Sequence, residues 1–129
     1  MFRLMIADDE DAERMGIRFL LHKFGYVFEI REAPDGMEAL KGLGEFPADI
    51  LVTDVKMPFL NGIDLAAKVR EQFPDMQIIF FSGYDDFEYV KQALSLQAVD
   101  YILKPVDPAE FNRVIGRVVE RLTREKETI

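Results

Sequence analysis

The segment Ile50-Leu51-Val52-Thr53-Asp54 is an unbroken run of strand-forming residues that ends in an acid. Similar short runs recur on both sides of it, separated by segments with helical spacing. The five strand candidates are Phe2–Ala7, Val27–Glu32, Ile50–Thr53, Gln77–Phe81 and Val99–Leu103. Four of them are mostly apolar without alternation, which is typical of strands buried on both faces of a parallel sheet. The more polar Val27–Glu32 is predicted to lie near a sheet edge.

Helical segments alternate with these strands, and four of them have an apolar stripe. The stripes are Ile17, Leu20, Leu21, Phe24; Leu65, Ala66, Val69, Phe73; Phe87, Val90, Leu94; and Phe111, Val114, Ile115, Val118, Val119, Leu122. Helix starts are indicated by Asp35 with Glu38, Asp85 with Glu88, and Asp107-Pro108, and Gly25 indicates a stop. The alternation predicts an α/β fold, a flavodoxin-like (βα)₅ three-layer sandwich with a parallel five-stranded sheet of order 2-1-3-4-5.

Composition narrows the class of protein. A length of 129 residues with 49% apolar residues suits one globular domain, which we place at residues 1–123, with 124–129 as a tail or the start of a linker. The absence of cysteine excludes disulfides and thiolate metal sites. A net charge of −8 argues against direct binding of nucleic acid by this domain. Neither a signal peptide nor an apolar run of ~18 residues is present, so we expect a cytoplasmic protein without a membrane span.

Polar residues follow four of the predicted strands. Asp8-Asp9-Glu10 comes after the first, Asp54 after the third, Ser82-Gly83 after the fourth and Lys104-Pro105 after the fifth. In an open parallel sheet, ligands bind at the carboxyl ends of the strands, where the strand order reverses. We therefore expect these side chains to share one pocket.

The chemistry of such a pocket is that of a hard cation and a phosphoryl group. Clustered carboxylates repel each other, and a divalent cation such as Mg²⁺ or Mn²⁺ relieves the repulsion. Lys104 would supply a charge and Ser82 a hydroxyl to phosphate oxygens, and Asp54 would be the nucleophile. Taken alone, Asp8-Asp9-Glu10 could simply begin a helix.

The single histidine, His22, lies off the apolar stripe, and we expect it to be exposed.

These residues resemble the response-regulator receiver domain of two-component systems over residues 2–122. The motifs that carry the resemblance are Asp8-Asp9, Thr53-Asp54-Val55-Lys56-Met57-Pro58, Asn61-Gly62, Ser82-Gly83 and Lys104-Pro105. The resemblance implies that Asp54 is the phospho-acceptor and that Mg²⁺ is held by Asp8, Asp9, Asp54 and the main-chain carbonyl of Lys56. It implies that Ser82 and Tyr101 form the switch, that Lys104 contacts the phosphoryl group, and that the Lys104–Pro105 bond is cis.

The resemblance also implies partners. The phosphoryl donor would be a phosphohistidine on a sensor histidine kinase, and a homodimer would form through the fourth helix, fifth strand and fifth helix. The stretches 82–87 and 101–106 resemble receivers that precede AraC-type DNA-binding domains. DNA would be reached only through such an output domain, which these residues do not contain, so we favour an excised receiver over a stand-alone one. No membrane partner is expected.

Three other functions fit part of the pattern. A phosphatase of the haloacid dehalogenase type needs an acid two residues after its nucleophile, where this chain has Lys56. A flavin-binding electron carrier needs a phosphate loop after the first strand, where the acids would repel phosphate. A degenerate receiver would only mediate contacts, although all five catalytic positions are filled here. We expect no enzyme activity beyond slow self-dephosphorylation, slowed further by the bulky Lys56 and Tyr84 beside the route of water.

Overall fold

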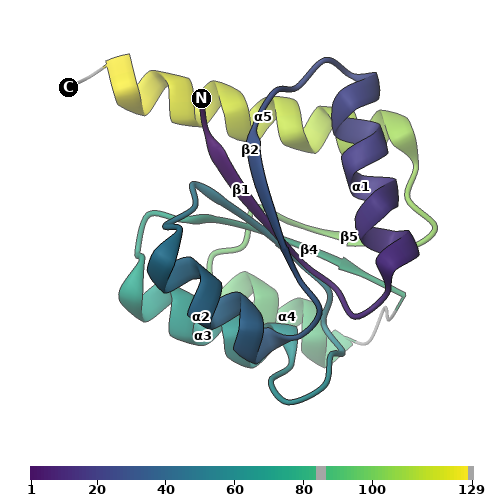
Figure 1. Cartoon of the computed structure of the whole chain (residues 1–129), viewed down its shortest axis with the longest axis vertical. Coiled ribbons are helices and arrows are strands. Elements are labelled where there is room, and N and C mark those ends of the chain that lie inside the picture. Colours follow the sequence, from purple (N-terminus) through teal and green to yellow (C-terminus); the bar gives the residue numbers. More distant parts are fainter. Residues whose placement is uncertain (84–86, 128–129) are drawn as a thin grey trace.

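A computed structural model describes residues 1–83 and 87–127. Strands and helices alternate along this part of the chain (Figure 1). The strands are β1 (Arg3–Ala7), β2 (Glu29–Ala33), β3 (Ile50–Thr53), β4 (Gln77–Ser82) and β5 (Asp100–Leu103). The helices are α1 (Asp11–Lys23), α2 (Gly36–Glu45), α3 (Gly62–Gln72), α4 (Phe87–Ser95) and α5 (Pro108–Glu127).

The strands form one parallel sheet of order β2-β1-β3-β4-β5, which confirms the predicted topology. The register pairs Ala7 of β1 with Thr53 of β3. The residue after each of these, Asp8 and Asp54, therefore leaves the sheet at the same edge. The polar β2 lies at the side of the sheet, as its sequence predicts, although it begins at Glu29 rather than at Val27.

Helices cover both faces of the sheet. Figure 1 shows α1 and α5 on one face and α2, α3 and α4 on the other. Each face has its own hydrophobic core, and neighbouring residues of β4 alternate between them: Phe80 packs with the α2–α3–α4 side and Phe81 with the α1–α5 side. Because β1, β3 and β4 are almost wholly buried, the polar residues at their carboxyl ends stand on a rigid base.

Most of the predicted helix ends are confirmed. The Asp35 side chain caps α2 by accepting a hydrogen bond of 2.8 Å from the Glu38 amide. Asp107 accepts one of 3.1 Å from the Ala109 amide at the start of α5. Gly25, at φ +80°, follows the end of α1, and the Tyr26 amide beyond it donates to the Leu21 carbonyl. The predicted start at Asp85 lies outside the described residues.

The predicted apolar stripe of α4 is wrong. Phe87 and Leu94 are 74% and 71% exposed, whereas Ala93 is 2% exposed. The core side of α4 is formed by Ala93 with Tyr89. The helix has apolar residues on two faces, and Phe87 and Leu94 lie on the outer one.

The C-terminal helix is longer than the sequence pattern indicates. α5 runs through Glu127, so residues 124–127 are helical, and they are exposed. The domain boundary at residue 123 stays a prediction. None of the helices in the described ranges is long and apolar enough to span a bilayer.

Candidate functional site

Two aspartates mark the centre of the candidate site, each one residue beyond a central strand. The Asp8 amide donates to the Ala33 carbonyl at 3.1 Å, and the Asp54 amide donates to the Ala7 carbonyl at 2.9 Å. These bonds continue the sheet ladder and fix where both side chains begin. Asp8 is 1% and Asp54 9% exposed, so their carboxylates are largely removed from water.

Asp9 completes a group of acids that fits a divalent cation. Asp8, Asp9 and Asp54 each offer a carboxylate oxygen, and these oxygens lie within 4.8 Å of one another. Asp9 is exposed, which leaves the group open to solvent on one side. Oxygen ligands of this kind suit Mg²⁺, which binds through one or two carboxylates and keeps several waters. The acids predicted from the sequence thus meet as a donor set that fits Mg²⁺, and Mn²⁺ has similar ligand preferences.

Lys104 brings a positive charge to the same place from the end of β5. Its Nζ lies 3.0 Å from Asp8 Oδ2, 3.3 Å from Asp54 Oδ2 and 3.6 Å from Glu13 Oε2. Its amide donates to the Ser82 carbonyl at 2.8 Å, and the bond to Pro105 is cis, as the resemblance implies. Burial lowers the pKa of Lys104, but the hydrogen bond to Asp8 and the charges of Asp54, Asp8 and Glu13 outweigh it and raise the pKa above its ordinary value.

The Asp54 carboxylate is under opposing influences. Burial raises its pKa, the Lys104 charge lowers it, and the Asp8 charge raises it again; the net result is a pKa above the ordinary range. The Val55 amide donates to Oδ1 at 2.7 Å, whereas Oδ2 faces Lys104. Asp8, Asp9, Asp54 and Glu13 surround the single ammonium of Lys104, so the carboxylates of the site outnumber that ammonium.

The chain after Asp54 is held close to it by Gly62, the first residue of α3. The Gly62 amide donates to the Val55 carbonyl at 2.7 Å. A Cβ at Gly62 would lie 1.8 Å from the Asp54 carbonyl oxygen, so only glycine fits there. Asn61 caps the helix by accepting a hydrogen bond of 2.8 Å from the Asp64 amide. The Asn61-Gly62 pair therefore both begins α3 and holds the backbone beneath Asp54 in place.

The other predicted site residues occupy the surroundings. Ser82 is fully buried at the end of β4. Tyr101, on β5, is half-buried, with its ring centroid 5.9 Å from that of Phe80. Lys56 is exposed, and its Nζ lies 5.8 Å from the centroid of the Tyr89 ring. The roles of Ser82 and Tyr101 in switching, and of the Lys56 carbonyl in metal binding, stay predictions.

Two residues of α1 that contact the site were not identified from the sequence. Glu13 reaches Lys104, and Arg14 donates to the Asp8 carbonyl. The signal was available in principle: both residues come one helical turn after Glu10, so they can face the strand ends. Tyr84, predicted to shield the route of water, lies outside the described residues.

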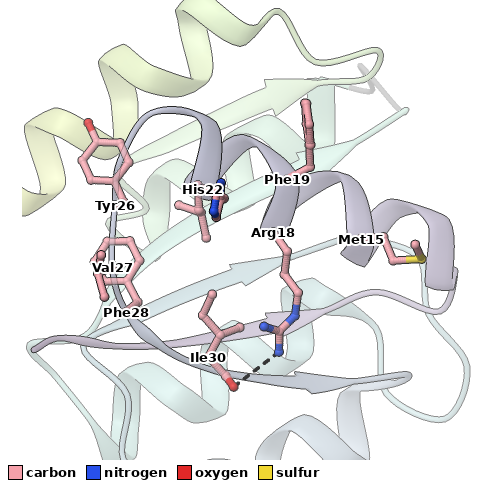
Figure 2. Close-up of a pocket in the computed structure, with 9 residues that line it drawn as sticks. Met15, Arg18, Phe19, His22, Tyr26, Val27, Phe28 and Ile30 are labelled. Carbon is pink, nitrogen blue, oxygen red and sulfur yellow. Dashed lines mark hydrogen bonds between the residues drawn. The ribbon is translucent and has the colours of Figure 1, made fainter.

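A separate groove of about 570 Å³ lies between α1 and β2 and contains none of the site acids. Figure 2 shows Met15 and Phe19 on the helix side and Val27 on the strand side, with Arg18 reaching the Ile30 carbonyl. His22 lines the groove and is exposed, as its sequence position predicts. The reactive groups, which are the carboxylates and the Lys104 ammonium, lie at the sheet edge and not in this groove.

Comparison with known proteins identifies relatives over nearly the whole chain. The family profile described as "Response regulator receiver domain" matches residues 4–115. The transcriptional regulatory protein HptR of Staphylococcus aureus is 37% identical over 127 residues, which are 98% of this chain and 50% of HptR. The chain thus spans about half the length of the curated relatives it matches.

Solved structures agree with the profile. The receiver domain of AraT, a response regulator from Geobacillus stearothermophilus, is 38% identical with a TM-score of 0.86, covering 97% of this chain and 98% of that one. A two-component transcriptional regulator described as AraC from Clostridium phytofermentans is 31% identical with a TM-score of 0.85, covering both chains fully. The similarity to receivers of AraC-type regulators expected from residues 82–87 and 101–106 is therefore confirmed.

Proposed function

Because the chain belongs to the response-regulator receiver family, we propose that it accepts a phosphoryl group on Asp54 from a sensor histidine kinase in the cytoplasm. One observation supports this most strongly: the Lys104 ammonium lies between the carboxylates of Asp8 and Asp54, with an Asp9 oxygen in the same group. Three acids and one ammonium at the ends of three strands match what transfer to a carboxylate requires.

The two oxygens of Asp54 have different surroundings, which suggests their roles. Oδ1 is engaged by the Val55 amide, and Oδ2 faces the pocket beside Lys104, so we assign Oδ2 as the attacking atom. The bond from this oxygen to phosphorus forms as the phosphorus–nitrogen bond of the phosphohistidine breaks, and the imidazole nitrogen leaves with the electron pair. The same proposal makes the domain a phospho-acceptor with slow self-dephosphorylation rather than an enzyme with other substrates.

The residues around Asp54 would position the phosphoryl group and neutralise its negative charge. Asp8, Asp9 and Asp54, together with the Lys56 carbonyl, would hold the cation, which supplies positive charge to the phosphoryl oxygens when bound. Lys104 would place its ammonium beside the transferred group, because its Nζ lies 3.3 Å from Asp54 Oδ2 and its pKa is above the ordinary value. The open side at Asp9 leaves room for the donor.

We assign the response to Ser82 and Tyr101. Ser82 would move its hydroxyl toward the phosphoryl group, and Tyr101, now half-buried against Phe80, would turn further inward. This would change the surface of α4, β5 and α5, through which a second copy would pair and an output, here transcription, would be controlled. The relatives' names support the transcriptional part of this proposal.

The test is intact mass after incubation with a small phosphodonor. The wild-type protein should gain one phosphoryl group with Mg²⁺ and far less when the cation is chelated. The Asp54→Asn variant should gain none. An unchanged mass of the wild type with Mg²⁺ would favour a degenerate receiver that only mediates contacts. Turnover of a phosphate ester by the wild type would favour the phosphatase.

A further inference from the structure

We propose that Arg14 is a positioning residue for the metal-binding acids: it fixes the main chain between β1 and α1, so that Asp8 and Asp9 present their carboxylates toward Asp54. This inference rests on the proposed function, because it concerns the cation of that same site. Arg14 would not touch the cation or the phosphoryl group. It would act through the backbone that carries two of the acids.

The side chain of Arg14 is held at three points. Its Nη1 donates to the Asp8 main-chain carbonyl, its Nη2 to the Asp11 carboxylate, and its Nε to Glu32 Oε1 at 2.9 Å. The side chain is 11% exposed, so it is enclosed by these partners rather than extended into solvent. One planar group thus contacts both ends of the segment that contains Asp9.

Glu32 anchors this arrangement to the sheet. It lies on β2, where it is paired in register with Ile6 of β1, two residues before Asp8. Its second carboxylate oxygen accepts a hydrogen bond from Arg18. Burial raises the pKa of Glu32, but the hydrogen bonds from Arg18 and Arg14 outweigh it, so the pKa lies below its ordinary value and the carboxylate stays charged. Arg14 therefore ties the acidic segment to β2.

Charge and position predict opposite results when Arg14 is neutralised. A guanidinium near the acids repels an incoming cation, so its removal by charge alone would tighten Mg²⁺ binding. Loss of the three contacts would let the Asp8–Asp11 segment move, and Mg²⁺ binding would weaken. The outer partners of metal ligands typically change metal affinity about 10- to 100-fold. The sign of the change thus separates the two explanations.

Arg18 supplies the matched control. It lies one turn further along α1, donates to the same Glu32, and reaches the Ile30 carbonyl at 3.5 Å (Figure 2). Its hydrogen bonds to Glu32 and Ile30 do not reach the Asp8–Asp11 segment. Arg18→Gln therefore removes the same charge and weakens the same anchor without releasing the acids.

The experiment measures Mg²⁺ affinity by calorimetric titration at constant ionic strength, together with urea unfolding in the absence of Mg²⁺. Arg14→Gln should weaken Mg²⁺ binding about tenfold or more. Arg14→Lys should weaken Mg²⁺ binding similarly, because one ammonium cannot make the three hydrogen bonds that the planar guanidinium makes. Arg18→Gln should leave the affinity unchanged. Unchanged or tighter binding by Arg14→Gln would overturn the proposal, as would equal weakening in Arg18→Gln.

A second measurement is independent of the metal. The Glu10 amide donates to Asp8 Oδ1 at 2.9 Å within the segment that Arg14 holds. Its hydrogen exchange without Mg²⁺ should be faster in Arg14→Gln than in the wild type and in Arg18→Gln. If the wild type bound no Mg²⁺, the proposed function would fail, and this exchange rate would decide the positioning role alone. Equal exchange in all three proteins would refute it.

Discussion

Asp54 is buried next to a second carboxylate, with one lysine shared between them. Replacing it with asparagine removes the repulsion and leaves the Lys104–Asp8 pair intact. We predict that Asp54→Asn raises the free energy of unfolding of the metal-free domain by roughly 1 kcal/mol, the usual scale of a single substitution. Urea unfolding with a chelator measures this. Saturating Mg²⁺ should reduce the advantage, because the wild type gains binding energy through three acids. A less stable metal-free variant would contradict the assignment.

The raised pKa of Asp54 makes the same difference depend on pH. The folded wild type binds its proton at a higher pH than the unfolded chain does. As the pH falls through the folded pKa, the wild type therefore gains stability relative to Asp54→Asn, until the pH lies below the ordinary pKa of aspartate. We predict that the gap in unfolding free energy shrinks on acidification, as urea titrations across this range would show. A gap that widens would mean that the pKa is lowered.

Gly62 and Gly16 provide a paired test of the backbone beneath the site. An alanine Cβ at Gly62 would collide with the Asp54 carbonyl, whereas one at Gly16 meets no atom within 4 Å. Gly62→Ala should cost about 1–3 kcal/mol, as overpacking does. Gly16→Ala, inside α1, should add about 0.5–1 kcal/mol. Thermal and urea unfolding measure both. A tolerated Gly62→Ala would show that the close approach is not required.

At the residue scale, the site residues that could be predicted from the sequence are those that follow a strand of the sheet. Asp8, Asp54 and Lys104 each follow a strand, and parallel strands end at one edge, so their meeting followed from order alone. The contacts of Gly62, Glu13 and Arg14 depend on how loops fold over that edge. The spacing of Glu13 and Arg14 from Glu10 allows both to face the strand ends, but it does not give their distances from Lys104 and Asp8, so their roles were not assigned from the sequence.

At the level of elements, α4 shows where periodicity fails. It is a nine-residue helix with apolar side chains on two faces, and the spacing of Phe87, Val90 and Leu94 does not reveal which face meets the sheet. The buried residue of α4 is the small Ala93, which packs in the core of that face of the sheet. The other three stripes include the buried residues Leu21, Val69 and Val114 and were predicted correctly. Each of those helices is longer, so one face dominates.

The exposure of Leu94 gives a direct check on that correction. Leu94 is 71% exposed, whereas Leu65 on α3 is fully buried. The same substitution at both positions should therefore differ in cost. We predict that Leu65→Ala lowers the free energy of unfolding by about 2–5 kcal/mol, and that Leu94→Ala changes it by less than about 0.5 kcal/mol. Urea unfolding of the two variants is sufficient. A large loss of unfolding free energy in Leu94→Ala would show that Leu94 is buried, as the predicted stripe requires.

For the molecule as a whole, two separate cores on a rigid sheet restrict where a signal can travel. Ser82 ends β4 and Lys104 follows β5, which α4 and Arg117 of α5 contact, whereas α2 packs against β1 and β2. We predict that phosphorylation changes amide hydrogen exchange in α4, β5 and α5 and leaves α2 unchanged. Exchange of the phosphorylated and Asp54→Asn proteins, compared by mass spectrometry under identical phosphodonor treatment, measures this. A uniform change across the sheet would argue against a local switch.

The proposed function requires one covalent bond, between phosphorus and a carboxylate oxygen of Asp54. Borohydride reduces an acyl phosphate to an alcohol, so reduction after phosphodonor treatment with Mg²⁺ marks the modified aspartate permanently. Peptide mass spectrometry should then find homoserine at position 54 and unmodified aspartate at positions 8 and 9. Homoserine at either of those positions, or unmodified Asp54 in a protein that binds Mg²⁺, would contradict it.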